Sequence, residues 1–309
     1  MATLGGIVFV AALIVVAMEP VLTASATIGI AIGVVGNDLP SRAVTNVRIY
    51  NADREMLTAF KNSSIIVTVA VPNYSVGTFA SSPEAALNWI NTNVKPFASN
   101  VSILLSAMQN THASLVALSL NIKVTTPHAS DATGFPPSEG KFPKPDAMKR
   151  ILQFLKEKNS AFMLNVYPFF AYTLNAAIDR NYAVFNPNNK PVIDMGRTYT
   201  NLFDALVDTH RSAMATLGYP DFPLVIGESG WPSAGSNARG VNIQDAQTYN
   251  NNLVKHVLSN KGTPMRPNVR MPTYIFALFN ENLKGGGIEN NWGLYHPNMT
   301  PVYSINLSV

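Results

Sequence analysis

The chain has 309 residues, of which 47% are hydrophobic and 13% charged, which suits one large α/β domain or two small ones. It contains no cysteine, which excludes a disulfide framework, a thiolate metal site and a thiolate nucleophile. The net charge of +4 comes from basic residues scattered along the chain, not gathered in a stripe with aromatic residues, so nucleic acid is not an expected partner.

The N-terminal segment has the pattern of a secretory signal peptide covering residues 1–26. Residues 7–17 form an apolar run that is short for a bilayer span, and Ala24-Ser25-Ala26 fits a small-residue cleavage site. We therefore expect a single secreted domain, residues 27–309, in the extracellular space or cell wall, with the vacuole as the alternative destination. The C-terminus has no hydrophobic tail, so no stable membrane anchor is expected. N-glycosylation sequons occur at Asn62, Asn73, Asn100, Asn298 and Asn306.

Short apolar segments rich in β-branched residues alternate with amphipathic segments. The seven predicted strands are residues 27–33, 46–50, 64–71, 121–126, 161–167, 224–228 and 273–279. The predicted helices are residues 83–94, 103–118, 146–158, 199–217 and 245–258. This alternation indicates a parallel sheet covered on both faces, and the length suits a (β/α)₈ TIM barrel, incomplete because only seven strands are clear. A doubly wound open sheet is the alternative, but no Gly-x-Gly-x-x-Gly turn follows the first strand.

Polar side chains follow the strands where a barrel places its chemistry, at the carboxyl ends. These positions hold Asp53, Asn73, His128, Tyr167, Glu228 and Glu281. No Gly-rich or Lys/Arg phosphate cradle occurs among them. Carboxylate, amide and aromatic groups together favour a neutral polyhydroxy ligand.

Glu228 stands where an apolar strand meets a Gly/Pro/Ser turn, and Trp231 follows three residues later. A carboxylate there is costly unless it is paired or used, and sugars stack on indole rings, so the pattern suggests carbohydrate chemistry. A buried Glu that caps a helix or pairs with a Lys is the structural alternative. Glycoside hydrolysis usually needs two carboxyl groups, and Glu281 ends what would be the adjacent strand. Asp53 lies further round and is expected to be structural.

Other chemistries fit less well. Ser229 lacks the Gly-x-Ser-x-Gly context of a serine nucleophile. The five histidines show no metal-binding spacing, so neither a metal site nor a cofactor is expected; His210 and His256 are expected to be surface or satisfied core residues. Asp204 and Asp208, one helical turn apart, are expected on a solvated helix face.

The motif Glu228-Ser229-Gly230-Trp231-Pro232-Ser233 resembles the plant β-1,3-glucanases of glycoside hydrolase family 17. The likeness continues in Val47-Arg48-Ile49-Tyr50, Val71-Pro72-Asn73, Thr125-Thr126-Pro127-His128, Asn165-Val166-Tyr167-Pro168 and residues 89–96, 199–204, 276–284 and 292–303. The resemblance implies a (β/α)₈ barrel with a long cleft for β-1,3-glucan, retaining endohydrolysis and a monomer. It implies that Glu228 is the nucleophile. It places the substrate-binding residues at Asn165, Tyr167, Trp231, Phe279, Glu281 and Lys284.

The chain departs from this family in three places. The family carries a fourth strand that ends in Gly-Asn-Glu, whose Glu is the general acid/base; here no Gly-Asn-Glu occurs, and no Glu lies between Glu84 and Glu139. Residues 100–105 could form a makeshift strand there but offer no carboxylate. The first helix has only residues 41–45 available to it, and Ala31-Ile32 replaces an aromatic residue.

These departures leave several hypotheses open. A barrel without one strand has two unpaired edges or closes with a different stagger, and loss of acid catalysis costs on the order of 10²- to 10⁴-fold. The chain could be an active glucanase that uses Glu281 as its acid, a non-catalytic glucan-binding wall protein, or a chain that does not fold stably. A further explanation of the departures is that the gene is intact and that two coding segments were left out when its protein sequence was derived.

Overall fold

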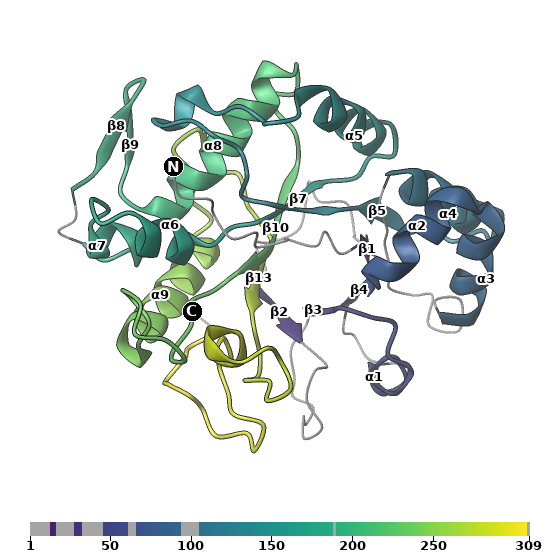
Figure 1. Ribbon diagram of the computed structural model, residues 1–309. Coiled ribbons are helices and arrows are strands. Elements are labelled where there is room, and N and C mark those ends of the chain that lie inside the picture. The colour runs from purple at the N-terminus through teal and green to yellow at the C-terminus, as the bar shows by residue number, and fades with distance from the viewer. Residues whose placement is uncertain are drawn as a thin grey trace, which may run out of the picture.

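The computed structural model describes residues 13–16, 28–32, 46–60, 66–93, 105–187 and 190–307. Within these ranges the main sheet contains the seven predicted strands, all running in the same direction around a ring (Figure 1). They are β2 (Ile28–Ile32), β3 (Asn46–Ile49), β4 (Ile66–Val71), β5 (Lys123–Thr125) continued by β6 (Pro127–Ala129), β7 (Phe162–Asn165), β10 (Leu224–Ser229) and β13 (Thr273–Phe276). The parallel pairs run β4–β3–β2–β13–β10–β7–β6, which confirms the barrel-type prediction.

The eighth position of the ring is filled by a segment that we had assigned to the signal peptide. Strand β1 (Leu13–Val16) lies between β4 and β5 and pairs antiparallel with both. Only Thr126 separates β5 from β6, so one run of chain pairs with β1 at its start and with β7 at its end. The edges left by the absent fourth strand are therefore paired in this structure. Removal of residues 1–26 as a signal stays a prediction.

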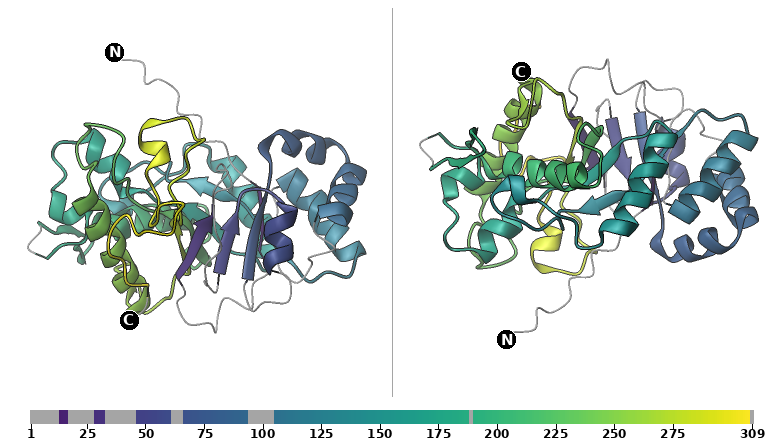
Figure 2. Two further views of the ribbon diagram at one scale, coloured as in Figure 1. Left: turned by 90° about the horizontal axis from the view of Figure 1, so that it is seen from below. Right: turned by 90° about the horizontal axis from the view of Figure 1, so that it is seen from above.

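Helices surround the ring, and α2, α3 and α4 gather on one side of it (Figures 1 and 2). The helices are α1 (Arg54–Phe60), α2 (Asn73–Ser81), α3 (Pro83–Asn93), α4 (Leu105–Ala117), α5 (Pro145–Glu157), α6 (Pro168–Leu174), α7 (Arg180–Ala183), α8 (Leu202–Thr216) and α9 (Ile243–Leu258), with short 3₁₀ turns η2 (Pro137–Glu139) and η3 (Gly287–Asn290). Two small hairpins are added: β8 (Val192–Asp194) with β9 (Arg197–Tyr199), and β11 (Gly262–Thr263) with β12 (Arg266–Pro267). No helix among the described residues is long and apolar enough to cross a membrane.

Caps explain where several helices begin. The predicted helices are present as α3, α4, α5, α8 and α9. Ser82 precedes α3, and its hydroxyl accepts the Ala85 N–H at 3.1 Å. Helix α8 begins later than predicted because the Asn201 side chain accepts the Asp204 N–H at 2.7 Å. The expected loss of the first helix, at residues 41–45, and most of the makeshift strand at residues 100–105 lie outside the described residues.

The inside of the ring is packed. A small core of Ala70, Ala161, Met163, Val225 and Tyr274 fills it, separate from the main core between the sheet and the helices. The ring interior is thus a filled core of the kind found in (β/α)₈ barrels, and chemistry is confined to the edge where the strands end.

The prediction of a solvated acidic face on α8 is wrong. Asp204 and Asp208 are 4% and 0% exposed, because α8 is buried along much of its length. Asp208 accepts hydrogen bonds from the Thr263 hydroxyl at 2.6 Å and the Met265 N–H at 2.7 Å, and burial raises its pKa to about 6. Asp204 contacts His256 on α9, while Asp208 contacts the segment around β11, so the two carboxylates serve separate tertiary contacts.

His210 is the satisfied core residue that the sequence suggested. It is fully buried on α8, its Nδ1 lies 2.8 Å from the Leu206 carbonyl, and its Nε2 lies 3.1 Å from the Ala132 N–H. Nε2 must accept from that N–H, so the proton resides on Nδ1 and the ring is neutral. Burial lowers the pKa of His210 to about 4, in agreement with this tautomer.

Candidate active site

Glu228, at the end of β10, is held by three donors. Its Oε1 lies 2.7 Å from Arg48 Nη1 and 2.9 Å from the Tyr50 hydroxyl. Its Oε2 accepts a hydrogen bond from the Tyr167 hydroxyl at 2.7 Å. The side chain is 13% exposed, so the carboxylate is largely desolvated but still accessible from the edge of the ring. Such charge-assisted hydrogen bonds fix the position of the carboxylate.

Strand alternation explains why β3 supplies two of these donors. Val47 and Ile49 belong to the main core, so Arg48 and Tyr50 project from the opposite face, into the ring. Arg48 is fully buried; its Nη1 also donates to the Gly227 carbonyl at 2.7 Å and lies 3.5 Å from Asn165 Oδ1. The Arg48 guanidinium is therefore the cation that compensates Glu228 inside the barrel.

The two tyrosines remain donors. Burial raises the pKa of the Tyr50 hydroxyl well above its ordinary value, and the Glu228 carboxylate raises it further. The same two causes, burial first, raise the pKa of Tyr167. Both phenols are therefore protonated at neutral pH and donate to Glu228.

Glu281 and Lys284 form a second charged pair beside the site. Glu281 follows β13, the neighbour of β10, and its charge acts on Tyr50, which shows that it lies near the same edge. Its side chain is 1% exposed, and its Oε2 lies 2.6 Å from Lys284 Nζ. Lys284 Nζ in turn stands 4.4 Å from the centre of the Phe276 ring. The predicted proximity of Glu281 to the Glu228 site is consistent with this arrangement.

Aromatic rings form the wall next to the carboxylate. Phe276 is half-buried and makes edge contacts with Tyr50 at 6.0 Å and with Tyr167 at 6.4 Å between ring centres. Trp292 stands 5.2 Å from Tyr167 and 6.0 Å from Phe276. Sequence reasoning did not assign Phe276 or Trp292 to the site.

Arg48 and Tyr50 were also missed as site residues. The sequence does indicate a special role for Arg48, because it is a charged residue inside a predicted strand, between the apolar residues Val47 and Ile49. A charge in such a strand must face an inner partner, because burial without one is costly.

Two predicted substrate-binding residues lie in the core, which corrects the sequence analysis. Trp231 is 0% exposed and Phe279 is 3% exposed. The Trp231 Nε1–H donates to the Gly240 carbonyl at 2.7 Å, and its ring packs against Tyr249 at 5.1 Å. The intervening Gly230 explains the inward turn, since a Cβ there would come 2.1 Å from the Phe276 carbonyl oxygen. Neither ring can stack on a sugar in this conformation.

The other polar strand ends have structural roles. Asp53 accepts the Met56 N–H at 2.9 Å and so caps the start of α1, as expected. His128 stacks on Phe162 with ring centres 4.7 Å apart, and burial lowers its pKa to about 4. Asn73 begins α2, and its side chain lies outside the described part of the structure.

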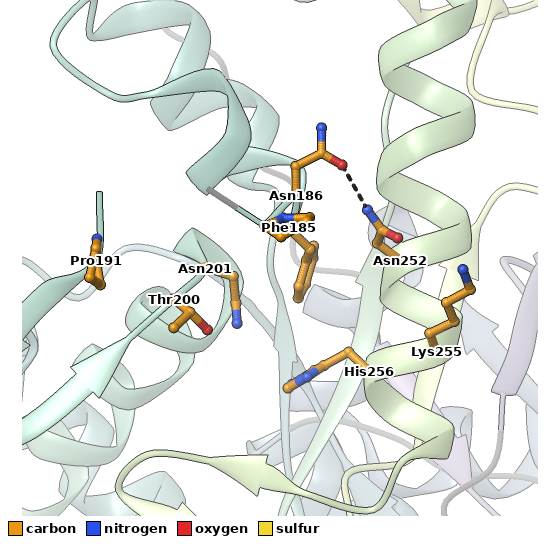
Figure 3. Close-up of a pocket in the computed structure, with 9 residues that line it drawn as sticks. Phe185, Asn186, Pro191, Thr200, Asn201, Asn252, Lys255 and His256 are labelled. Atoms are coloured by element: carbon orange, nitrogen blue, oxygen red, sulfur yellow. Dashed lines mark hydrogen bonds between the residues drawn. The ribbon is translucent and has the colours of Figure 1, made fainter. Parts of the chain in front are cut away.

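A hollow of about 500 Å³ lies elsewhere, between the segment after α7 and helices α8 and α9 (Figure 3). It is lined by Phe185, Asn186, Asn201, Asn252 and His256, among others, and by none of the residues that contact Glu228. His256 Nε2 lies 2.9 Å from Asp204 Oδ1, so this histidine joins α9 to α8.

A carboxylate held by Arg48, Tyr50 and Tyr167 at the carboxyl edge of a barrel matches one half of the two-carboxyl site that glycoside hydrolases usually carry. The chain belongs to glycosyl hydrolases family 17, whose profile matches residues 28–111 and 99–307. The two matched segments overlap at residues 99–111, the region where the family's Gly-Asn-Glu strand has no counterpart in the sequence.

Relatives and solved structures agree with this assignment. The chain is 39% identical to an acidic isoform of glucan endo-1,3-beta-glucosidase from Zea mays, with 96% of each chain covered. It is 38% identical to glucan endo-1,3-beta-glucosidase 3 of Arabidopsis thaliana over 87% of this chain but only 60% of that protein, so it spans well under the full length of that relative. A beta-1,3-glucanase and pollen allergen of Cryptomeria japonica superimposes with a TM-score of 0.86 at 43% identity, covering 92% of this chain and 99% of the other.

Proposed function

We propose that this protein acts on β-1,3-glucan as a retaining endo-glucosidase in which Glu228 is the nucleophile. The observation that carries the proposal is the position of this carboxylate: Arg48, Tyr50 and Tyr167 hold it, and it is 13% exposed at the ring edge. Family membership and the activity named for the maize and Arabidopsis relatives support the substrate class.

The geometry gives each side chain a task in this reaction. Attack by a Glu228 oxygen on the anomeric carbon forms a glycosyl ester while the bond from that carbon to the departing glucan oxygen breaks, and that oxygen takes a proton from water. Water then attacks the same carbon, and the electron pair of the ester bond returns to Glu228. Arg48 fixes the carboxylate in one orientation during the first attack. The Tyr50 and Tyr167 hydroxyls share the negative charge in the free site, and their hydrogen bonds stabilise the carboxylate again when the ester breaks.

Sugar binding is assigned to the polar groups and rings around Glu228. Asn165, Glu281 and Lys284 offer hydrogen-bond donors and acceptors for hydroxyl groups, while the half-buried Phe276 ring offers an apolar face. These groups bind a neutral polyhydroxy chain without a metal or a cofactor in any step.

The test is the release of reducing ends from a linear β-1,3-glucan. The wild-type chain should release them faster than Glu228→Gln, and the matched control Glu157→Gln, on the outer helix α5, should keep the wild-type rate. Equal rates for wild type and Glu228→Gln, both at background, contradict a nucleophilic role for Glu228.

Non-catalytic binding of β-1,3-glucan is the second candidate, favoured by the ion pair that occupies Glu281. It predicts retention on insoluble β-1,3-glucan that weakens in Tyr167→Ala and is unchanged in Glu157→Gln, without release of sugars from any variant. Passage of the wild-type protein without retention counts against it.

Secretion and a monomeric state are further parts of the proposal. The apolar run and the Ala24-Ser25-Ala26 site support cleavage after Ala26. N-terminal sequencing of protein recovered from the medium should begin at Thr27, and light scattering should give the mass of one chain. Retention of the protein inside the cell with Met1 intact contradicts secretion.

A further inference from the structure

Among the residues that the structure describes, no carboxyl group beside Glu228 is free to protonate a leaving oxygen. Glu281 is the other carboxylate whose charge reaches this site, and it is 1% exposed and engaged by Lys284 at 2.6 Å. The hydroxyls of Tyr50 and Tyr167 are weak acids, because burial raises the pKa of each, and both are directed at Glu228 itself.

The strand position between β4 and β5 adds no acid. In the full chain β1 fills it with Leu-Ile-Val-Val, and the proposed cleavage after Ala26 removes β1 without supplying a carboxyl group. In the observed register Leu13 lies opposite Val71, the last residue of β4, so β1 reaches the carboxyl edge with an apolar residue. Asp53 is used as a helix cap, and Asp131, two residues after β6, is influenced by Lys144 rather than by any group of the Glu228 site.

We propose that this site transfers β-1,3-glucosyl groups much faster from donors whose leaving group departs without a proton than from glucan itself, and delivers them best to an anionic nucleophile. The proposal rests on the proposed function, because it takes Glu228 as the nucleophile. It adds the class of donor and acceptor that the observed set of side chains accommodates.

Each step balances without a proton donor. A Glu228 oxygen forms a bond to the anomeric carbon while the bond from that carbon to an aryl oxygen breaks, and the aryloxide leaves with the electron pair. Azide then forms a bond to the same carbon from the opposite face, the ester bond breaks, and its electron pair returns to Glu228. The product is a glucosyl azide with the original β configuration.

The experiment uses the full chain and a series of aryl β-laminaribiosides with 2,4-dinitrophenyl, 4-nitrophenyl and phenyl leaving groups. We expect kcat/KM to fall by at least on the order of 10²-fold from the dinitrophenyl to the phenyl donor, since an absent acid costs about that much or more. Azide should accelerate consumption of the dinitrophenyl donor and yield the β-laminaribiosyl azide, identified by NMR. Glu228→Gln, checked for folding by circular dichroism, should do neither.

Two variants test for a hidden acid. Glu281→Gln should lower kcat/KM for all three donors by a common factor, and Asp131→Asn should leave the dependence on the leaving group as it is. If kcat/KM depends more steeply on the leaving group in either variant than in the wild type, the substituted residue is a proton donor and the inference is overturned.

The outcomes separate the two proposals. A wild-type enzyme that cleaves the phenyl donor nearly as fast as the dinitrophenyl donor, without a response to azide, retains the proposed function and refutes this inference. A wild-type enzyme that releases no more dinitrophenolate than Glu228→Gln refutes both.

Discussion

The contact between Arg48 and Glu228 makes a quantitative prediction about stability. Arg48 is fully buried, Glu228 is 13% exposed, and their atoms lie 2.7 Å apart. Removing one partner of a buried ion pair leaves an uncompensated charge and typically costs about 3–5 kcal/mol. We therefore expect Arg48→Met and Glu228→Gln each to lower the free energy of unfolding by about that amount.

The double variant should cost less than the sum of the two single variants. Arg48→Met also removes the hydrogen bond to the Gly227 carbonyl, which the second substitution does not restore. The remaining interaction between the two charges should appear as a coupling energy of about 2–3 kcal/mol, at the upper end for residues in contact.

The measurement is urea unfolding at pH 7, followed by far-ultraviolet circular dichroism. The matched control is the pair Arg266 and Asp221, whose side chains are 29% and 76% exposed and whose coupling should stay below about 1 kcal/mol. Additivity within about 0.5 kcal/mol for Arg48→Met and Glu228→Gln refutes the view that Arg48 is held by the Glu228 charge.

Four further predictions concern the buried groups, the sheet and the site. Because burial lowers the pKa of His210 to about 4, the unfolded chain binds a proton there from pH 6.5 downward while the folded chain does not. The contribution of His210 to the free energy of unfolding is therefore full above pH 6.5 and falls by about 3 kcal/mol toward pH 4. His210→Gln should reduce the dependence of the unfolding free energy on pH, measured by urea titrations at a series of pH values. A chain of residues 27–309 lacks β1 and its six cross-strand Cα pairs. Its free energy of unfolding should therefore be lower by about 1–6 kcal/mol, which thermal unfolding records as a lower Tm. Trp231→Ala should cost about 3–5 kcal/mol of stability, whereas Tyr167→Phe should lower turnover of an activated donor about 10- to 100-fold.

Each of these predictions has a clear contrary result. If the unfolding free energy of His210→Gln depends on pH as steeply as that of the wild type, the buried neutral ring is contradicted. The raised pKa of Asp208 changes the stability in the opposite sense between pH 4 and 6, but Asp208 is present in both proteins, so its effect cancels in the comparison. For the sheet, Val15→Pro in the full chain is the control, since proline cannot donate to the ladder, and a Tm equal to wild type contradicts pairing by β1. Loss of glucan retention by folded Trp231→Ala contradicts the assignment of Trp231 to the core.

The strands were predictable because each is a short apolar run buried on both faces. The segment 224–228, for example, has a sequence that suits only a buried strand or a short buried helix. The Gly/Pro turn that follows limits the segment to a length typical of a strand. Helices α1 and α6 were not predicted. Each has only seven residues, and so short a helix is stabilised by packing rather than by a pattern in its own sequence.

The site was predictable only in part. The motifs placed Glu228, Glu281 and Lys284 at neighbouring strand ends, and the structure keeps them together. Trp231 was assigned to the substrate site and not to the core, because a sequence motif does not indicate in which direction a side chain points.

Strand β1 exposes a different limit of sequence reasoning. The apolar core of a signal peptide and a buried strand have the same composition, and a run such as Leu13–Val16 carries no periodicity that distinguishes them.

The position of Trp292 gives the protein a built-in optical reporter. Its indole stands 5.2 Å from Tyr167, whose hydroxyl bonds Glu228, and its N–H has no hydrogen-bond partner among the described residues. Of the other two tryptophans, Trp231 is sealed in the core, and Trp89 sits on α3 beside Phe79. We expect emission changes on sugar binding to originate at Trp292, which contacts Tyr167, so that occupancy of the proposed site can be followed without a label.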